Sequence, residues 1–118
     1  MIEKVKSGTV GTVILAESPT AGNEVQDKVL LSELNAIQKN ALESQTALPL
    51  LLARLVIHSN RTVFQIPIGQ AATWNRDLVK KGGEVLAKEG RANGIHWTFT
   101  PMLDIARDPS WGIIAESY

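Results

Sequence analysis

Apolar residues gather in three short runs along this chain, and two longer stretches with helical periodicity lie between the runs. Residues 10–16, 50–57 and 95–103 are almost continuously apolar, a pattern typical of parallel strands that are covered on both faces. An alternation of strands and helices favours an α/β fold with right-handed crossovers. The pattern therefore predicts a βαβαβ unit with a small parallel sheet.

The first helical stretch is expected to begin at Asn23, a residue type that caps helices well, and to end near Ser44. Its apolar residues recur at steps of three and four, which indicates one buried face. They are Val25, Val29, Leu30, Leu34, Ile37 and Ala41. Most charged residues of the stretch fall on the other side, so an amphipathic helix is predicted.

The second helix is expected over residues 76–92, with Asn75 as its N-cap and Asn93-Gly94 as its stop. Its expected buried residues are Leu78, Val79, Val85, Leu86 and Ala87. Three internal glycines each cost about 1 kcal/mol relative to alanine, so this helix should be the weaker one. Residues 59–73, with Pro67 and Gly69 as breakers, are expected to form a loop.

Composition fits one soluble globular domain, or a piece of one, over residues 1–118, because 44% of the residues are hydrophobic and 20% are charged. Twelve basic and twelve acidic residues give a formal net charge of zero. Without a basic stripe, neither nucleic acid nor an anionic membrane is an expected partner. No stretch approaches the roughly 20 apolar residues of a membrane span.

Cysteine is absent and only two histidines are present, so neither a disulfide nor a transition-metal site is expected. Gly82-Gly83 matches no nucleotide-binding fingerprint, and no cofactor is predicted. The start MIEKVKSG lacks the apolar run of a signal peptide. A cytoplasmic location is therefore the default, but removal of a leader would give the same sequence, so the location stays undetermined.

Polar and aromatic residues follow the third apolar run, where α/β enzymes place ligand sites at the carboxyl ends of their strands. They are Asp104, Arg107, Asp108, Trp111 and Glu116. An equally weighted alternative is that Arg107 and Asp108 pair with each other and with the backbone to hold the loop. Trp111 could stack on a sugar, but loop packing is the more frequent use of tryptophan.

The end of the second run adds Arg54 and His58 as candidate ligand-binding residues. The structural alternatives are that Arg54, like Arg61, pairs with Asp104 or Asp108, and that His58 is a hydrogen-bonded structural histidine. His96 is also expected to be structural. Two further tryptophans are interpreted structurally, Trp97 as a core residue and Trp74 as an anchor at a helix start.

Three segments carry a family resemblance. Residues 96–118 read HWTFTPMLDIARDPSWGIIAESY, residues 49–75 read PLLLARLVIHSNRTVFQIPIGQAATWN, and residues 7–15 read SGTVGTVIL. In their order and spacing they resemble glycoside hydrolase family 3, and they cover nearly the whole chain. The resemblance implies part of a TIM-like barrel, β-glucosidase-type hydrolysis of O-glycosidic bonds, and a carbohydrate ligand.

The chain departs from the family pattern at two sugar-binding positions. Leu55 stands where the family has an aspartate that binds sugar hydroxyls, and Ile113 stands where it has an arginine. Neither replacement can exchange hydrogen bonds with a sugar, and each lost partner costs about 1–3 kcal/mol. Further differences are Ser59, Gln65 and Ser110.

A TIM barrel needs about 250 residues, whereas this chain has 118. The resemblance implies that the nucleophilic aspartate, a sugar-binding Lys-His pair and the acid/base glutamate come later, so no catalytic residue is assigned here. The expectation is an amino-terminal barrel segment that is inactive alone. The alternatives are a degenerate non-catalytic scaffold or interaction protein, and a short hydrolase that uses Asp104, Asp108 and Glu116.

A barrel piece leaves a strand edge and apolar surface uncovered. Self-association or the missing barrel half would cover them, and a homo-oligomer is the simplest expectation because closed symmetric assemblies are common.

Overall fold

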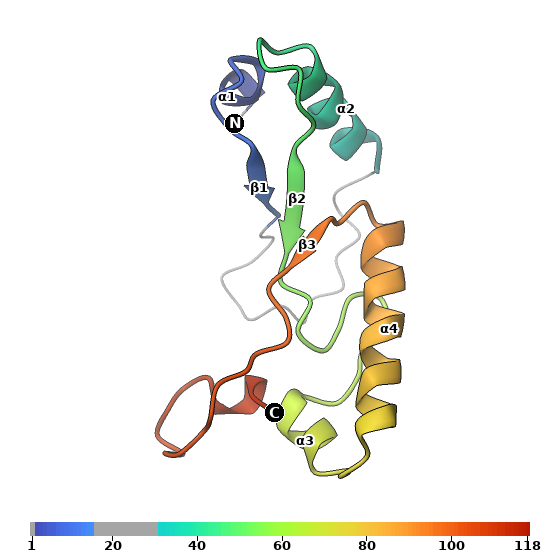
Figure 1. Cartoon of the computed structure of the whole chain (residues 1–118), viewed down its shortest axis with the longest axis vertical. Coiled ribbons are helices and arrows are strands. Elements are labelled where there is room, and N and C mark those ends of the chain that lie inside the picture. The colour runs from blue at the N-terminus through green and yellow to red at the C-terminus, as the bar shows by residue number, and fades with distance from the viewer. Residues whose placement is uncertain (1, 16–30) are drawn as a thin grey trace.

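The computed structural model describes residues 2–15 and 31–118. In chain order the elements are α1 (Ile2–Lys6), β1 (Thr12–Ile14), α2 (Leu31–Leu42), β2 (Leu51–Arg54), α3 (Pro67–Ala71), α4 (Arg76–Ala92), β3 (Trp97–Thr98) and the 3-10 helix η1 (Ile114–Glu116). The strands form one parallel sheet in the order β1-β2-β3 (Figure 1). The predicted α/β class and small parallel sheet are therefore confirmed.

Among the described residues, helices cover one face of the sheet only. Val13 pairs with Leu52, and both side chains are buried, Leu52 with 1% exposed. Side chains alternate between the faces of a strand, so Ile14, Leu51 and Trp97 belong to the opposite face. Their exposed fractions are 56%, 50% and 47%. Ala53 belongs to the same face and is fully buried, so the described residues leave this apolar face largely, but not wholly, open, whereas a parallel sheet normally buries both faces.

The covered face packs against the amino-terminal helices. The core cluster consists of Val5, Val13, Leu34, Ala41, Leu50 and Leu52, and α1 lies beside α2. Gln38 fastens α2 to the start of β2, because its Nε2 donates to the Leu50 carbonyl at 2.8 Å. Its Oε1 accepts from the Leu50 N–H at 2.9 Å. Packing and this paired hydrogen bond together hold α1, β1, α2 and β2 in place.

The predicted face of α2 is confirmed where the structure describes it. Leu34 and Ala41 are buried and Ile37 is half-buried. Asn23, Val25, Val29 and Leu30 lie outside the described residues, so the expected start of this helix is not tested.

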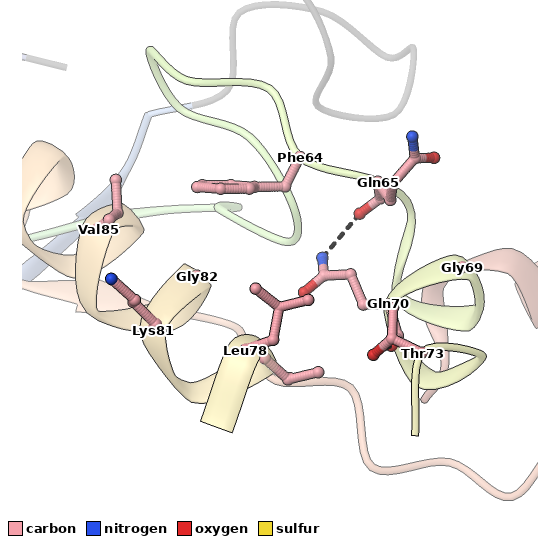
Figure 2. A pocket seen from close by; sticks show the side chains of 10 residues that line it. Phe64, Gln65, Gly69, Gln70, Thr73, Leu78, Lys81, Gly82 and Val85 are labelled. Atoms are coloured by element: carbon pink, nitrogen blue, oxygen red, sulfur yellow. Dashed lines mark hydrogen bonds between the residues drawn. The ribbon is translucent and has the colours of Figure 1, made fainter. Parts of the chain in front are cut away.

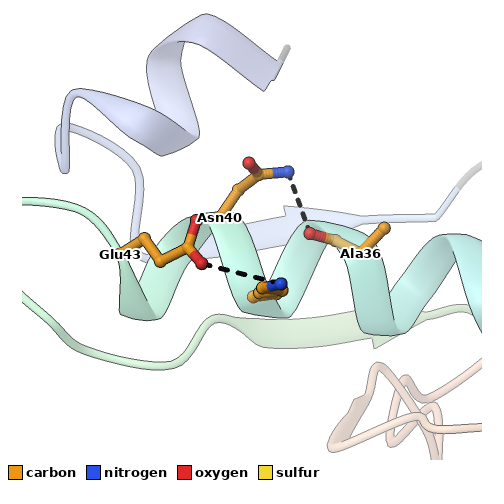
Figure 3. A network of polar contacts seen from close by, with 4 residues as sticks. Ala36, Asn40 and Glu43 are labelled. Atoms are coloured by element: carbon orange, nitrogen blue, oxygen red, sulfur yellow. Dashed lines mark hydrogen bonds and ion pairs between the residues drawn. The ribbon is translucent and has the colours of Figure 1, made fainter.

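The outer side of α2 is polar, as Figure 3 shows. Asn40 donates from Nδ2 to the Ala36 carbonyl at 2.9 Å. Lys39 and Glu43 form an ion pair at 3.9 Å in which both side chains are largely exposed. Pairs of this kind typically contribute only about 0.3–0.5 kcal/mol. The stability of α2 therefore comes mainly from its buried face.

The predicted bounds and cap of α4 are confirmed. The Asn75 side chain accepts a hydrogen bond from the Leu78 N–H at 3.0 Å. Gly94 follows the helix with a φ of 78°, which glycine adopts without strain. The expected burial is correct for Leu86 but wrong for Leu78 and Ala87, which are exposed. The helix packs through a narrower stripe than predicted, because its flanks lack neighbours among the described residues.

The predicted strands are too long. Residues 50–57 yield only Leu51–Arg54, and residues 95–103 yield only Trp97–Thr98. The third strand is short because it pairs only with Ala53 and Arg54, and because Pro101 has no N–H to donate. For residues 10–16 the described strand is Thr12–Ile14.

Two tryptophan interpretations are wrong. Trp97 lies on the open face of the sheet instead of the core, and its ring meets Phe99 at a centroid distance of 5.1 Å. Trp74 is almost fully exposed and has a positive φ, so it anchors no helix start. The expected loop over residues 59–73 contains the short helix α3, which Pro67 begins.

Candidate functional site

The carboxyl ends of β2 and β3 lead into the lower half of the molecule in Figure 1. Leu55 directly follows β2, has 45% of its surface exposed, and continues the alternation of Leu51 and Ala53. Arg54 pairs with Thr98, is half-buried, and continues the alternation of the helix-covered face. Ile113 is 44% exposed. Leu55 and Ile113, which replace the two sugar-binding residues of the family pattern, are therefore both accessible.

His58 is held inside a tight turn. Its Nδ1 lies 3.1 Å from the Phe64 carbonyl oxygen, and the Phe64 N–H donates to the His58 carbonyl at 2.9 Å. Ser59 and Val63 form an antiparallel bridge above this contact. The structural alternative for His58 is thus supported, because one ring nitrogen already has a partner in the turn and the side chain is buried.

The tip of this turn is bound to α4. The Glu89 carboxylate accepts from the Arg61 N–H at 3.0 Å and from the Thr62 N–H at 2.8 Å. The Thr62 hydroxyl donates to its other oxygen. These hydrogen bonds from the Thr62 side chain and backbone, helped by Arg61, hold the pKa of Glu89 below its ordinary value. One alternative paired Arg61 with Asp104 or Asp108, whereas the structure places Arg61 beside Glu89.

The loop after β3 is largely exposed at Asp104, Arg107 and Asp108. Asp108 Oδ1 accepts from the Ser110 N–H at 2.9 Å, and this hydrogen bond lowers the pKa of the Asp108 carboxyl. The Trp111 N–H donates to the Asp108 carbonyl at 3.1 Å. Asp108 therefore shapes its own turn through backbone contacts, which agrees with the loop-holding alternative for this residue.

The last residues of the chain lie beside the segment of residues 49–75. The 3-10 helix η1, which contains Glu116, lies beside α3. Tyr118 contributes to a cavity of about 500 Å³ together with Val56, Leu86 and Leu103, and burial raises the pKa of its phenol. The fold thus brings the end of residues 96–118 into contact with residues 49–75, while Asp104, Arg107 and Asp108 stay on the exposed loop.

A second cavity of about 370 Å³ lies between α3 and α4, as Figure 2 shows. Phe64, Leu78 and Val85 give it apolar walls. Gln70 donates from Nε2 to the Gln65 carbonyl at 2.7 Å. The cavity offers packing surface and few groups that could orient a sugar.

Across residues 2–15 and 31–118, no three His, Cys, Asp or Glu side chains are grouped so that they could hold a metal ion. In the same residues, no helix is both long and apolar enough to cross a membrane.

Sequence reasoning missed Glu89 as a residue that shapes the site. One signal was present, because Glu89 lies near the carboxyl end of α4, where the helix dipole disfavours a negative charge. An acidic residue at such a position needs compensating donors. The donors come from the turn at Arg61 and Thr62, which only the folded chain brings to α4.

Comparison with known proteins identifies the fold. The family model described as the glycosyl hydrolase family 3 N terminal domain matches residues 1–118. The chain belongs to this family. The resemblance stated from the sequence is thereby confirmed, and so is the interpretation of the small parallel sheet as part of a TIM-like barrel domain.

Three relatives show how similar the chain is in sequence and how much of each relative it covers. The chain is 35% identical over 116 residues to the periplasmic beta-glucosidase of Salmonella typhimurium, covering 98% of the chain and 14% of that protein. It is 28% identical over 113 residues to the lysosomal beta glucosidase of Dictyostelium discoideum, covering 86% and 14%. It is 37% identical over 62 residues to a beta-xylosidase of Formosa agariphila, covering 52% and 9%. The chain therefore spans about one seventh of the first relative.

Proposed function

We propose that this chain forms the first βα units of a family 3 glycoside hydrolase barrel and contributes a pyranose-binding surface at the carboxyl ends of β2 and β3. By itself it turns over no glycoside. The observation that carries the proposal is the family match over residues 1–118, and the printed names of the relatives, beta-glucosidases and a beta-xylosidase, support the substrate class.

The open face of the sheet supports a place inside a barrel. In a (β/α)₈ barrel the helices cover the outer face of the strands, and the inner face is filled by side chains from the other strands. Here α1 and α2 cover one face, while Ile14, Leu51 and Trp97 lie exposed on the other. This asymmetry is expected of strands whose barrel neighbours lie beyond the described residues.

The carboxylates of residues 96–118 supply no ready catalytic pair. Retaining glycoside hydrolysis needs two carboxyl groups about 5 Å apart on either side of the scissile bond. Asp108 is engaged by Ser110, Asp104 lies on the exposed loop, and Glu116 lies in η1 beside α3. The proposed role of Asp104, Arg107, Trp111 and Glu116 is therefore to contact sugar and not to break its glycosidic bond.

Sugar affinity is expected to be weak, because Leu55 and Ile113 present apolar surface where hydroxyls would need partners. Two lost partners at about 1–3 kcal/mol each correspond to a few powers of ten in affinity.

Hydrolysis of a chromogenic aryl β-glucoside by the pure chain tests the proposal, with Glu116→Gln as the matched variant. We expect no turnover by either protein. Clear turnover that Glu116→Gln abolishes would instead establish the short-hydrolase alternative, since Glu116 would then belong to the catalytic machinery.

The second candidate function is a non-catalytic scaffold or interaction protein, and the exposed apolar side chains of Leu55 and Ile113 favour it. A scaffold would need no sugar affinity and would self-associate or bind a partner through its open sheet face. Titration of the chain with methyl β-D-glucopyranoside separates the candidates, because saturable shifts in residues 104–116 are expected only for a pyranose site.

A further inference from the structure

The turn formed by residues 58–64 is closed at two points. At its base, His58 and Phe64 exchange hydrogen bonds through the His58 ring, the Phe64 carbonyl and the backbone. At its tip, Arg61 and Thr62 donate to Glu89, which lies 28 and 27 residues later in the chain. Glu89 is thus a link between α4 and the segment that follows the carboxyl end of β2.

The link is chemically strong for a single side chain. Two successive backbone N–H groups and one hydroxyl converge on the two oxygens of one carboxylate. Hydrogen bonds to an ionised acceptor are roughly twice as strong as neutral ones. They also offset the unfavourable position of an anion near the carboxyl end of α4. The lowered pKa of Glu89 agrees with this arrangement.

The base of the turn follows the carboxyl end of β2 closely in the chain. His58 follows Leu55 by three residues and begins the turn that Glu89 holds at its tip. A shift of the tip would therefore move the hydrogen-bonded base, which holds the His58 ring in its orientation. By contrast, the exposed Glu84 of the same helix takes no part in this link.

We propose that Glu89 is a positioning residue that fixes the turn of residues 58–64 on α4 and thereby sets the orientation of the His58 ring at the carboxyl end of β2. That the carboxyl end of β2 faces a sugar rests on the proposed function. The positioning itself is a property of the chain and can be measured without any ligand.

Nuclear magnetic resonance of the ¹⁵N-labelled chain provides the test, with Glu89→Gln as the main variant and Glu84→Gln as the matched control. Loss of the carboxylate should move the amide proton signals of Arg61 and Thr62 upfield and change the ring nitrogen shifts of His58. The control should leave all of these signals in place. Thr62→Val should reproduce part of the change, and Thr62→Ser, which keeps the hydroxyl donor, should restore the signals.

A His58 ring that is unchanged in Glu89→Gln, while the variant stays folded, overturns the inference. So does an equal change in Glu84→Gln, which would indicate a general effect of charge on the helix. If Glu89→Gln fails to fold, the Thr62→Val and Thr62→Ser pair decides, because rescue by serine requires the hydroxyl contact with Glu89.

Titration with methyl β-D-glucopyranoside is a separate measurement. Binding that is at least about twofold weaker in Glu89→Gln than in Glu84→Gln would extend the positioning to the sugar surface. Absence of binding in the unmodified chain would count against the proposed function alone, because the His58 signals would still report on Glu89.

Discussion

Replacement of Leu52 by alanine should be among the most damaging single changes in the core. Leu52 is the second residue of β2, has 1% of its surface exposed, and belongs to the cluster with Val5, Val13 and Leu34. Leu51 precedes it on the same strand but belongs to the open face, where 50% of it is exposed. The pair therefore compares the two faces of one sheet with identical chemistry.

The expected loss in the free energy of unfolding follows from the burial of each leucine. Leucine to alanine removes three carbon groups, worth about 0.8 kcal/mol each when fully buried, and the remaining cavity adds to the loss. We expect Leu52→Ala to lower the free energy of unfolding by about 3 kcal/mol. Leu51→Ala should lower it by about 1 kcal/mol, because half of the side chain is already in water and no closed cavity forms. Domains of this size have about 5–15 kcal/mol in total.

Urea unfolding followed by tryptophan fluorescence measures both losses, since Trp97 is half-exposed in β3 and contacts Phe99. With a slope of about 2 kcal/mol per molar urea, the midpoint should fall by about 1.5 M for Leu52→Ala and by about 0.5 M for Leu51→Ala. The slope itself should stay constant.

Equal losses in the two variants, at a concentration where light scattering finds only monomer, would refute this reasoning. They would mean that the face of Leu51 is buried within one chain. A loss below about 1 kcal/mol for Leu52→Ala would refute the assignment of the core.

Four other expectations are open to measurement. Asn75→Ala should lower the free energy of unfolding by about 1 kcal/mol in thermal unfolding, because the cap to Leu78 is lost; a variant as stable as the unmodified chain would contradict the cap. The double variant Leu55→Asp, Ile113→Arg should gain sugar affinity in calorimetry but hydrolyse no aryl β-glucoside, because binding groups supply no nucleophile or acid; measurable hydrolysis would reveal a catalytic pair that we have not identified. The chain should form a homo-oligomer, most simply a dimer, through its open sheet face, so its melting temperature should rise with protein concentration; a compact, cooperatively melting monomer at micromolar concentration would exclude this. The folded-state pKa of Glu89 is lowered from 4.5, so its contribution to stability is present above that pH and is lost as the pH falls through the folded value; Glu89→Gln, but not Glu84→Gln, should flatten this acid limb of the stability curve.

The sequence by itself determined the features that depend on near neighbours. Asn75 and the Asn93-Gly94 stop predicted both ends of α4, because caps and turn residues act within a few positions of the chain. The spacing of Leu34, Ile37 and Ala41 predicted the buried face of α2 for the same reason. The polar residues that follow the second and third apolar runs also predicted a candidate site at the carboxyl ends of these strands.

Tertiary structure alone decided which apolar residues are buried and what holds the site. The apolar strands predicted Trp97 and Leu51 as core residues, yet the helices that the structure describes cover only the face of Val13 and Leu52. Periodicity reports that a residue is apolar, but burial depends on whether another element reaches it. The link from Glu89 to Thr62 was hidden for the same reason, because 27 residues separate the partners and only the packing of α4 beside the turn brings them into contact.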